Sequence, residues 1–272
     1  MAAMVDHIEI VLFHTPALNN FPSMREVMTL KKLGAEEDVG FSVHLPAALE
    51  IASRDRRTRE KSVSMVVDII DFMSELDPVH HILHIPFTTP TLTSVPGLYF
   101  TAEHRDEFID WTLRATESLE TIQDRIDRRN GILVENINYS PIYLERFWKL
   151  GLCGFCLDMG HLMLGRESVS GVSRQFMSAI EEIHLHGVEG HAEHLSLAVL
   201  PKPRVAKWIA LLIAAGYKGV INLEVFSRES LASSMNILSE VFQVCQRSRE
   251  NGHDHFHNPT KEGRAWRGRS TI

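Results

Sequence analysis

The chain has 272 residues, of which 44% are hydrophobic, and a formal net charge of -7. This composition is too apolar for a disordered or fibrous protein, and a general nucleic-acid binder would carry the opposite charge. The sequence has neither a membrane-length apolar run nor a basic leader with a cleavage site, so we expect a soluble cytoplasmic protein that does not cross a membrane. Three cysteines, Cys153, Cys156 and Cys245, are too few for a disulfide framework and fit a reducing compartment.

Short apolar segments recur along the chain, with amphipathic stretches between them. The segments predicted as strands buried on both faces are residues 7–13, 40–46, 81–87, 131–137, 153–159, 181–187 and 219–225. Between them, apolar residues spaced three and four apart indicate one face of a helix, as in residues 63–73 and 108–126. This alternation predicts an α/β fold with a parallel sheet, and its repetition predicts a TIM-type (β/α) barrel.

The predicted strands number seven, one fewer than in the eightfold barrel. We expect either a first strand upstream of residue 1 in longer relatives or a barrel that closes differently. Residues 1–246 are predicted to form this single barrel domain. Residues 247–272 lose the apolar periodicity, are rich in basic residues and contain three histidines, which predicts a disordered, basic, His-containing tail.

Polar side chains stand late in most of the predicted strands. In chain order they are His44, His84, Glu135, Asp158 with His161, His184 with His186, and Glu224. Active sites of (β/α) barrels form where the carboxyl ends of the strands meet, so we expect these side chains to converge.

One buried His or Glu is more often an ordinary hydrogen-bonded core residue than a ligand. The whole set is different, because no matching set of Lys or Arg stands at the strand ends to neutralise it. Divalent cations would neutralise it. Mixed His, Asp and Glu ligands favour zinc, manganese or iron over calcium.

The order of these residues resembles the xylose-isomerase-like barrels, the superfamily that includes endonuclease IV-type repair enzymes and sugar epimerases. Within it, residues 8–23, 43–51, 82–87 and 183–197 look most like the cobamide-remodelling phosphodiesterases. Those enzymes cleave the phosphoester that joins the corrin side chain to the lower-ligand riboside.

The resemblance assigns metal ligands residue by residue. One metal would take His44, His84 and Glu135, and a second would take Glu135, Asp158, His184 and Glu224. His161 and His194 would hold a third. The nucleases place an Asp two residues before that last His, where this chain has Ala192, with Glu193 or His191 the nearby substitutes.

The resemblance therefore implies a metal-dependent phosphodiesterase that hydrolyses the phosphoester of a cobamide, with water activated by two or three zinc or manganese ions. Its partner would be a small-molecule phosphodiester, with nucleic acid and membrane disfavoured. Lys202 and Arg204 could help to hold this substrate, although exposed basic residues are usually only solvated. The sequence does not fix the oligomeric state.

The alternative is a single-metal sugar isomerase or epimerase of the same superfamily. There Glu135, Asp158, His184 and Glu224 would hold one ion that polarises a carbonyl, while Glu135 and Glu224 move protons as catalytic residues. A barrel that binds metal and ligand without turnover is a third hypothesis. His186 would be a ligand or a partner of one, and an exposed loop is expected for His191.

Overall fold

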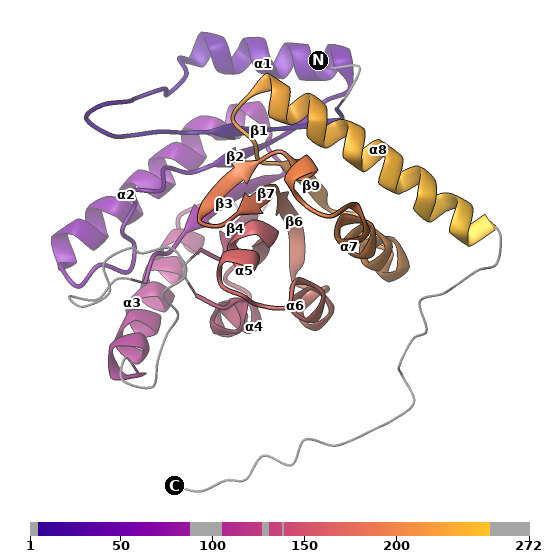
Figure 1. The fold of residues 1–272 in the computed structure, drawn as a ribbon. Helices are drawn as coiled ribbons and strands as arrows, with labels where there is room; N and C mark the ends of the chain where they lie inside the picture. The colour runs from indigo at the N-terminus through magenta and orange to yellow at the C-terminus, as the bar shows by residue number, and fades with distance from the viewer. Residues whose placement is uncertain (1–4, 88–104, 127–130, 138, 251–272) are drawn as a thin grey trace, which may run out of the picture.

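The computed structural model describes residues 5–87, 105–126, 131–137 and 139–250. Within these, seven parallel strands form one sheet in the order β1-β2-β3-β4-β5-β6-β9. They are β1 (His7–Val11), β2 (Gly40–His44), β3 (His80–His84), β4 (Gly131–Glu135), β5 (Gly154–Asp158), β6 (Ile180–Leu185) and β9 (Val220–Leu223). Each corresponds to one predicted strand segment. The expectation of a TIM-type α/β barrel is confirmed, and the described residues supply seven strands to it, one fewer than in the eightfold barrel (Figure 1).

The two ends of the sheet, β1 and β9, are not joined by a backbone ladder in the described chain. Side chains bridge this seam, because Nδ2 of Asn222 on β9 donates to Oε1 of Glu9 on β1 at 2.9 Å. The barrel is therefore nearly closed at the place where an eighth strand would belong.

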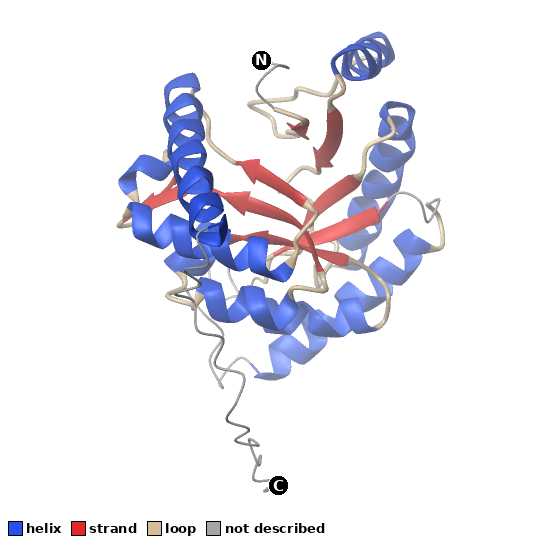
Figure 2. Cartoon of the chain, turned by 90° about the vertical axis from the view of Figure 1, so that its right-hand side faces the viewer, coloured by secondary structure: helices blue, strands red, loops and turns tan. Residues whose placement is uncertain are grey.

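Helices lie outside the sheet, as Figures 1 and 2 show. They are α1 (Met24–Glu37), α2 (Arg56–Met73), α3 (Arg105–Gln123), α4 (Glu145–Lys149), α5 (Met159–Leu164), α6 (Val169–Phe176), α7 (Lys202–Ala215) and α8 (Arg228–Glu250), with short 3-10 turns η2 (Ser74–Leu76), η4 (Pro141–Leu144) and η5 (Leu197–Val199). The helix α8 continues four residues past the predicted domain boundary at 246. The rest of the predicted tail, 251–272, lies outside the described residues.

Most residues of β2 to β6 are buried, whereas β1 and β9 at the seam are only partly buried, so the prediction of strands buried on both faces is wrong for these two. The core has two parts. Outward residues such as Val43, Leu83 and Ile183 pack in the large cluster that includes the helices. Inward, Ile82, Leu133 and Cys156 form a small separate apolar cluster. Because side chains alternate along a strand, the inward positions two residues beyond Ile82, Leu133 and Cys156 are the predicted ligands at the strand ends.

A two-stranded antiparallel hairpin, β7 (Gly187–Glu189) and β8 (Ala192–Leu195), follows β6 and was not predicted from the sequence. It carries His194 back toward the strand ends. None of the helices in the described part of the chain combines the length and the hydrophobicity that crossing a membrane requires.

Candidate metal centre

Glu135, the last residue of β4, lies at the centre of the site and is only 1% exposed. Its Oε2 is 3.2 Å from Nε2 of both His44 and His84 and 3.3 Å from Nδ1 of His184, and its Oε1 is 3.3 Å from Nδ1 of His161. Burial alone would raise the pKa of Glu135, but the facing histidines outweigh burial and hold this pKa well below its ordinary value. One carboxylate thus connects imidazoles from three other strand ends and from α5.

Asp158 ends β5 and also caps α5, because its Oδ1 accepts a hydrogen bond from the backbone N–H of His161 at 2.6 Å. Asn136 fixes this position from the neighbouring strand end: its Oδ1 accepts from the N–H of Asp158 at 2.9 Å, and its Nδ2 donates to the Asp158 carbonyl at 3.0 Å. The other carboxylate oxygen, Oδ2, faces Nε2 of His186 at 3.3 Å. The run Asp–Met–Gly–His at the junction of β5 and α5 therefore places a carboxylate and an imidazole at one mouth.

Gly160 stands between these groups because a side chain there would meet the His186 ring. An added Cβ would lie 1.9 Å from Cε1 of His186, far inside van der Waals contact. Only glycine leaves room for that ring.

Backbone carbonyls orient two of the rings. Nδ1 of His44 lies 2.8 Å from the Leu45 carbonyl, and Nδ1 of His161 lies 2.8 Å from the Asn136 carbonyl. A ring nitrogen that donates to a carbonyl leaves the opposite nitrogen of a neutral imidazole as the acceptor or ligand. For both residues this nitrogen is Nε2, which faces Glu135 in His44 and Glu193, at 3.7 Å, in His161.

The hairpin supplies His194, whose φ of 55° lies in the left-handed region that residues other than glycine seldom adopt. Its Nδ1 is 3.5 Å from Oε2 of Glu224, and its ring lies against those of His186 and Phe226, with centroids 4.4 and 4.7 Å away. Strained backbone of this kind is common at functional sites.

Candidate ligand atoms within 4.8 Å of one another form overlapping groups: His44, His84 and Glu135; Glu135, Asp158, His184 and Glu224; His161, Glu193 and His194; and His186, His194 and Glu224. The structure thus brings all eight predicted ligands to one mouth of the barrel. That they bind a cation stays a prediction.

Three buried atoms in these groups fit a cation, namely Nδ1 of His184, Nδ1 of His194 and Oε2 of Glu224. None of them makes a hydrogen bond among the described residues, and Oε2 of Glu224 lies 3.3 Å from Nδ1 of His184. Buried polar atoms without partners are rare in folded proteins and call for an explanation. Metal ions held in the two groups that share Glu224, one with His184 and one with His194, would satisfy these atoms.

Sequence reasoning missed the polar residues on the inner wall below the mouth. Oε2 of Glu9 lies 3.0 Å from Nε2 of His184, and the buried Glu182 accepts a hydrogen bond from the Ser42 hydroxyl at 3.1 Å. Cys156, which the sequence did not single out as a ligand, also belongs to a group with Glu135 and His184. The signal was present, since Glu182 alternates with His184 and His186 along one strand.

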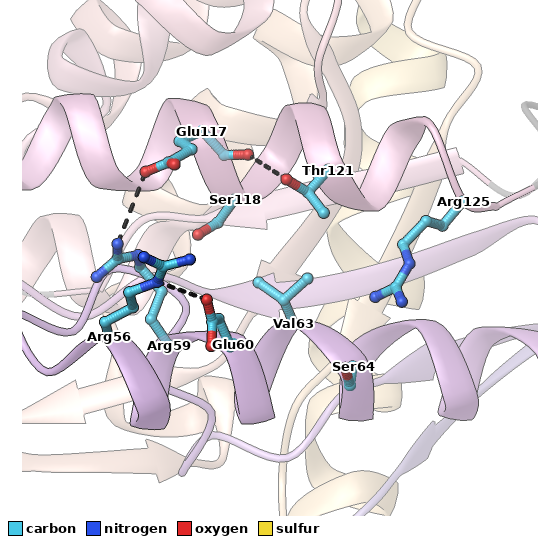
Figure 3. Close-up of a pocket in the computed structure, with 9 residues that line it drawn as sticks. All are labelled: Arg56, Arg59, Glu60, Val63, Ser64, Glu117, Ser118, Thr121 and Arg125. Carbon is cyan, nitrogen blue, oxygen red and sulfur yellow. Dashed lines mark hydrogen bonds and ion pairs between the residues drawn. The ribbon is translucent and has the colours of Figure 1, made fainter.

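Residues expected at the periphery lie away from these groups. Lys202 pairs with Glu240 on α8, Arg204 is exposed in the first turn of α7, and His191 is exposed on the hairpin. A groove of about 460 Å³ lies between α2 and α3, but none of its lining residues is a predicted ligand, and Glu60 and Glu117 pair with two of its arginines (Figure 3).

Residues 2–247 match the family described as "Xylose isomerase-like TIM barrel". The chain belongs to this family. Its barrel of parallel strands, with His and Glu side chains clustered at one mouth, agrees with that membership. The buried clusters are of the kind with which the xylose isomerase-like superfamily binds metal. No curated protein matches the chain.

Solved structures with the same fold carry the names of sugar epimerases. A D-tagatose 3-epimerase-like protein has a TM-score of 0.71 at 21% identity, over 90% of this chain and 91% of its own. An L-ribulose 3-epimerase has a TM-score of 0.63 at 16% identity, over 93% and 89%. A D-psicose 3-epimerase from Clostridium cellulolyticum H10 has a TM-score of 0.62 at 15% identity, over 90% and 91%. At identities this low, the three structures show only that this chain has the same barrel fold. None of the three is named a cobamide phosphodiesterase.

Proposed function

We propose that this xylose isomerase-like barrel is a metal-dependent phosphodiesterase that acts on a small phosphodiester, with the lower-ligand loop of a cobamide as the specific candidate. The observation that carries the proposal is the number of ligand-type side chains at the mouth. A single-ion reaction needs only Glu135, Asp158, His184 and Glu224, and it leaves the groups around His44 with His84 and around His161 with His194 without a purpose. Two or three zinc or manganese ions would use them all.

Divalent ions held in these groups would lower the pKa of a water molecule and offset the charge of a phosphodiester. The side chains at the barrel mouth would position these ions. Glu135 joins the groups, since its Oε2 faces His44, His84 and His184 while its Oε1 faces His161. Glu193 would take the place of the missing Asp at position 192, since its carboxylate lies 3.7 Å from His161 and 3.9 Å from His194.

A side-chain nucleophile is not needed for this reaction. The thiol of Cys156 is 1% exposed, and burial raises its pKa well above the ordinary value, so it stays protonated and unreactive at neutral pH. An unreactive Cys156 agrees with a reaction in which water, and not a side chain, attacks the phosphorus.

The second candidate is a single-metal sugar epimerase, and the comparisons favour it, because the three solved structures above are named as 3-epimerases or epimerase-like. Glu135 and Glu224 would then move protons, as both lie 3.3 Å from Nδ1 of His184 and so flank the same position. The two candidates share these residues and differ over His44 and His84.

One experiment separates them. Metal content would be measured on purified protein supplied with Zn²⁺ or Mn²⁺, and the same sample would be incubated with adenosylcobamide or with ketoses such as D-tagatose. Two or more ions per chain with release of the riboside would support the phosphodiesterase. One ion with epimerised ketose would reject it, and bound metal without either activity would favour a ligand-binding protein.

A variant sharpens the choice. His84→Ala removes a ligand that only the multi-ion centre uses, so hydrolysis should fall by about 10- to 100-fold, whereas a single-metal epimerase should keep most of its activity. His191→Ala is the matched control, because His191 is an exposed histidine on the hairpin and belongs to none of the ligand groups given above.

A further inference from the structure

We infer that Glu9 is a positioning residue for the metal centre: its carboxylate turns the His184 ring so that Nδ1 faces Glu135 and Glu224. This inference rests on the proposed metal centre and adds to it a residue from the opposite side of the seam. Glu9 lies on β1, and His184 lies on β6.

The geometry begins with one short contact inside the barrel. Oε2 of Glu9 lies 3.0 Å from Nε2 of His184, and the side chains are 2% and 0% exposed. A carboxylate has no proton to donate when ionised, so Nε2 is the donor and carries the hydrogen. In a neutral ring the lone pair then lies on Nδ1, which is buried, lacks a hydrogen bond and stands 3.3 Å from carboxylate oxygens of both Glu135 and Glu224.

Among the described carboxylates, Glu9 is the one within hydrogen-bond distance of that nitrogen. The nearest carboxylate besides it belongs to Glu182, whose Oε1 is 4.0 Å from Nε2 of His184 and accepts instead from the Ser42 hydroxyl. Without Glu9, a buried N–H would lose its partner. The His184 ring could also rotate by half a turn about its Cβ–Cγ bond, which would put a carbon atom where Nδ1 now faces Glu135 and Glu224. The hydrogen bond to Glu9 favours the orientation in which Nδ1 can bind a metal.

Glu9 also bridges the seam, because its Oε1 accepts from Nδ2 of Asn222. The two roles can be separated, since the seam bond involves Oε1 and Asn222 while the ring bond involves Oε2 and His184. Asn222→Ala removes only the first, and Glu9→Ala removes both. In Glu9→Gln the amide oxygen can still accept from His184 while its NH2 donates to a rotated Asn222, so this conservative variant should rescue.

The test is the Zn²⁺ affinity of the full chain, measured by competition with a chromophoric chelator. Glu9→Ala should weaken binding by about 10- to 100-fold, Asn222→Ala should stay within about threefold of the wild type, and Glu9→Gln should recover most of the loss. Equal losses in Glu9→Ala and Asn222→Ala would overturn the inference and reduce Glu9 to a residue that closes the barrel.

A measurement on the wild-type protein covers the case in which Glu9→Ala does not fold. Long-range ¹⁵N–¹H correlations of the imidazoles in the Zn²⁺-loaded protein identify which nitrogen of His184 holds the proton. A proton on Nε2 with metal at Nδ1 is expected, and metal at Nε2 would refute the role of Glu9. If the wild type takes up no Zn²⁺, the proposed metal centre fails; if it does and only the Glu9 results disagree, the positioning role alone fails.

Discussion

Metal binding should release protons from His44 and His161. Burial lowers the pKa of His44, but the hydrogen bond to Glu135 and the negative charges of Glu135 and Glu9 together outweigh burial and raise this pKa to about 9. For His161, burial is outweighed by Asp158 and Glu135, and the pKa rises to about 10. In the metal-free protein at pH 7.5 both rings are therefore cationic, and a ring must lose its proton from the coordinating nitrogen before it can bind a metal.

The size of the effect follows from those two values. Each pH unit below the pKa costs about 1.4 kcal/mol per proton displaced, so at pH 7.5 proton competition weakens binding by about 2 kcal/mol at His44 and about 3.5 kcal/mol at His161. Both rings stay protonated up to about pH 8.5. Raising the pH from 7.5 to 8.5 should therefore increase the affinity about 100-fold where both rings are ligands.

Isothermal titration calorimetry measures this directly, in two buffers of different ionisation enthalpy at pH 7.5. The difference in heat gives the number of protons released, and about two are expected from these rings. The raised pKa values of His44 and His161 also stabilise the metal-free fold. This stabilisation is complete below pH 6.5 and is lost as the pH rises through 9 for His44 and through 10 for His161. An affinity that is flat between pH 7.5 and 8.5, with no protons released, would refute the assignment of His44 and His161 as ligands.

Three further predictions concern single positions. Gly160→Ala should lower the free energy of unfolding in urea by about 2 kcal/mol or more, because its Cβ would overlap the His186 ring; an unchanged or higher stability would contradict this contact. Burial lowers the pKa of His81 to about 4, so below pH 6.5 the unfolded chain binds a proton at His81 that the folded protein does not bind. Between pH 7 and pH 4 the free energy of unfolding of the wild type should therefore fall by about 3 kcal/mol relative to that of His81→Phe. A stability difference that stays constant over this range would contradict the prediction. Glu193→Ala should remove one bound metal by elemental analysis while His191→Ala removes none, and equal metal content in both would exclude Glu193 as a ligand.

Much of the fold follows from the sequence because parallel strands buried on both faces read as unbroken apolar runs. Such runs place all seven strands, and the spacing of Val63, Val66, Val67 and Ile70 places α2. The hairpin β7–β8 escapes this reasoning, since its strands have three and four residues and contain Gly, Glu and His. Its pairing is decided by the tertiary structure, because the His194 amide bonds to Nδ1 of His186.

Part of the candidate site could also be predicted from the sequence, and part could not. Glu135, His184 and Glu224 could be found because a polar residue at the end of an apolar strand is conspicuous, and parallel strands bring their carboxyl ends together. Glu9 could not be found, because its importance depends on which strand lies across the seam from β1. In an eight-stranded barrel another strand would pair there, whereas here Asn222 and His184 face Glu9.

The most direct test of the metal centre is anomalous diffraction from crystals soaked in Zn²⁺ or Mn²⁺, with data collected at the absorption edge of the metal. We expect a peak about 2.0–2.2 Å from ligand atoms of Glu135, Asp158, Glu224 and Nδ1 of His184. A second peak is expected beside His44 and His84. Saturated crystals with no peak at the barrel mouth, or with metal only at histidines elsewhere on the chain, would contradict it.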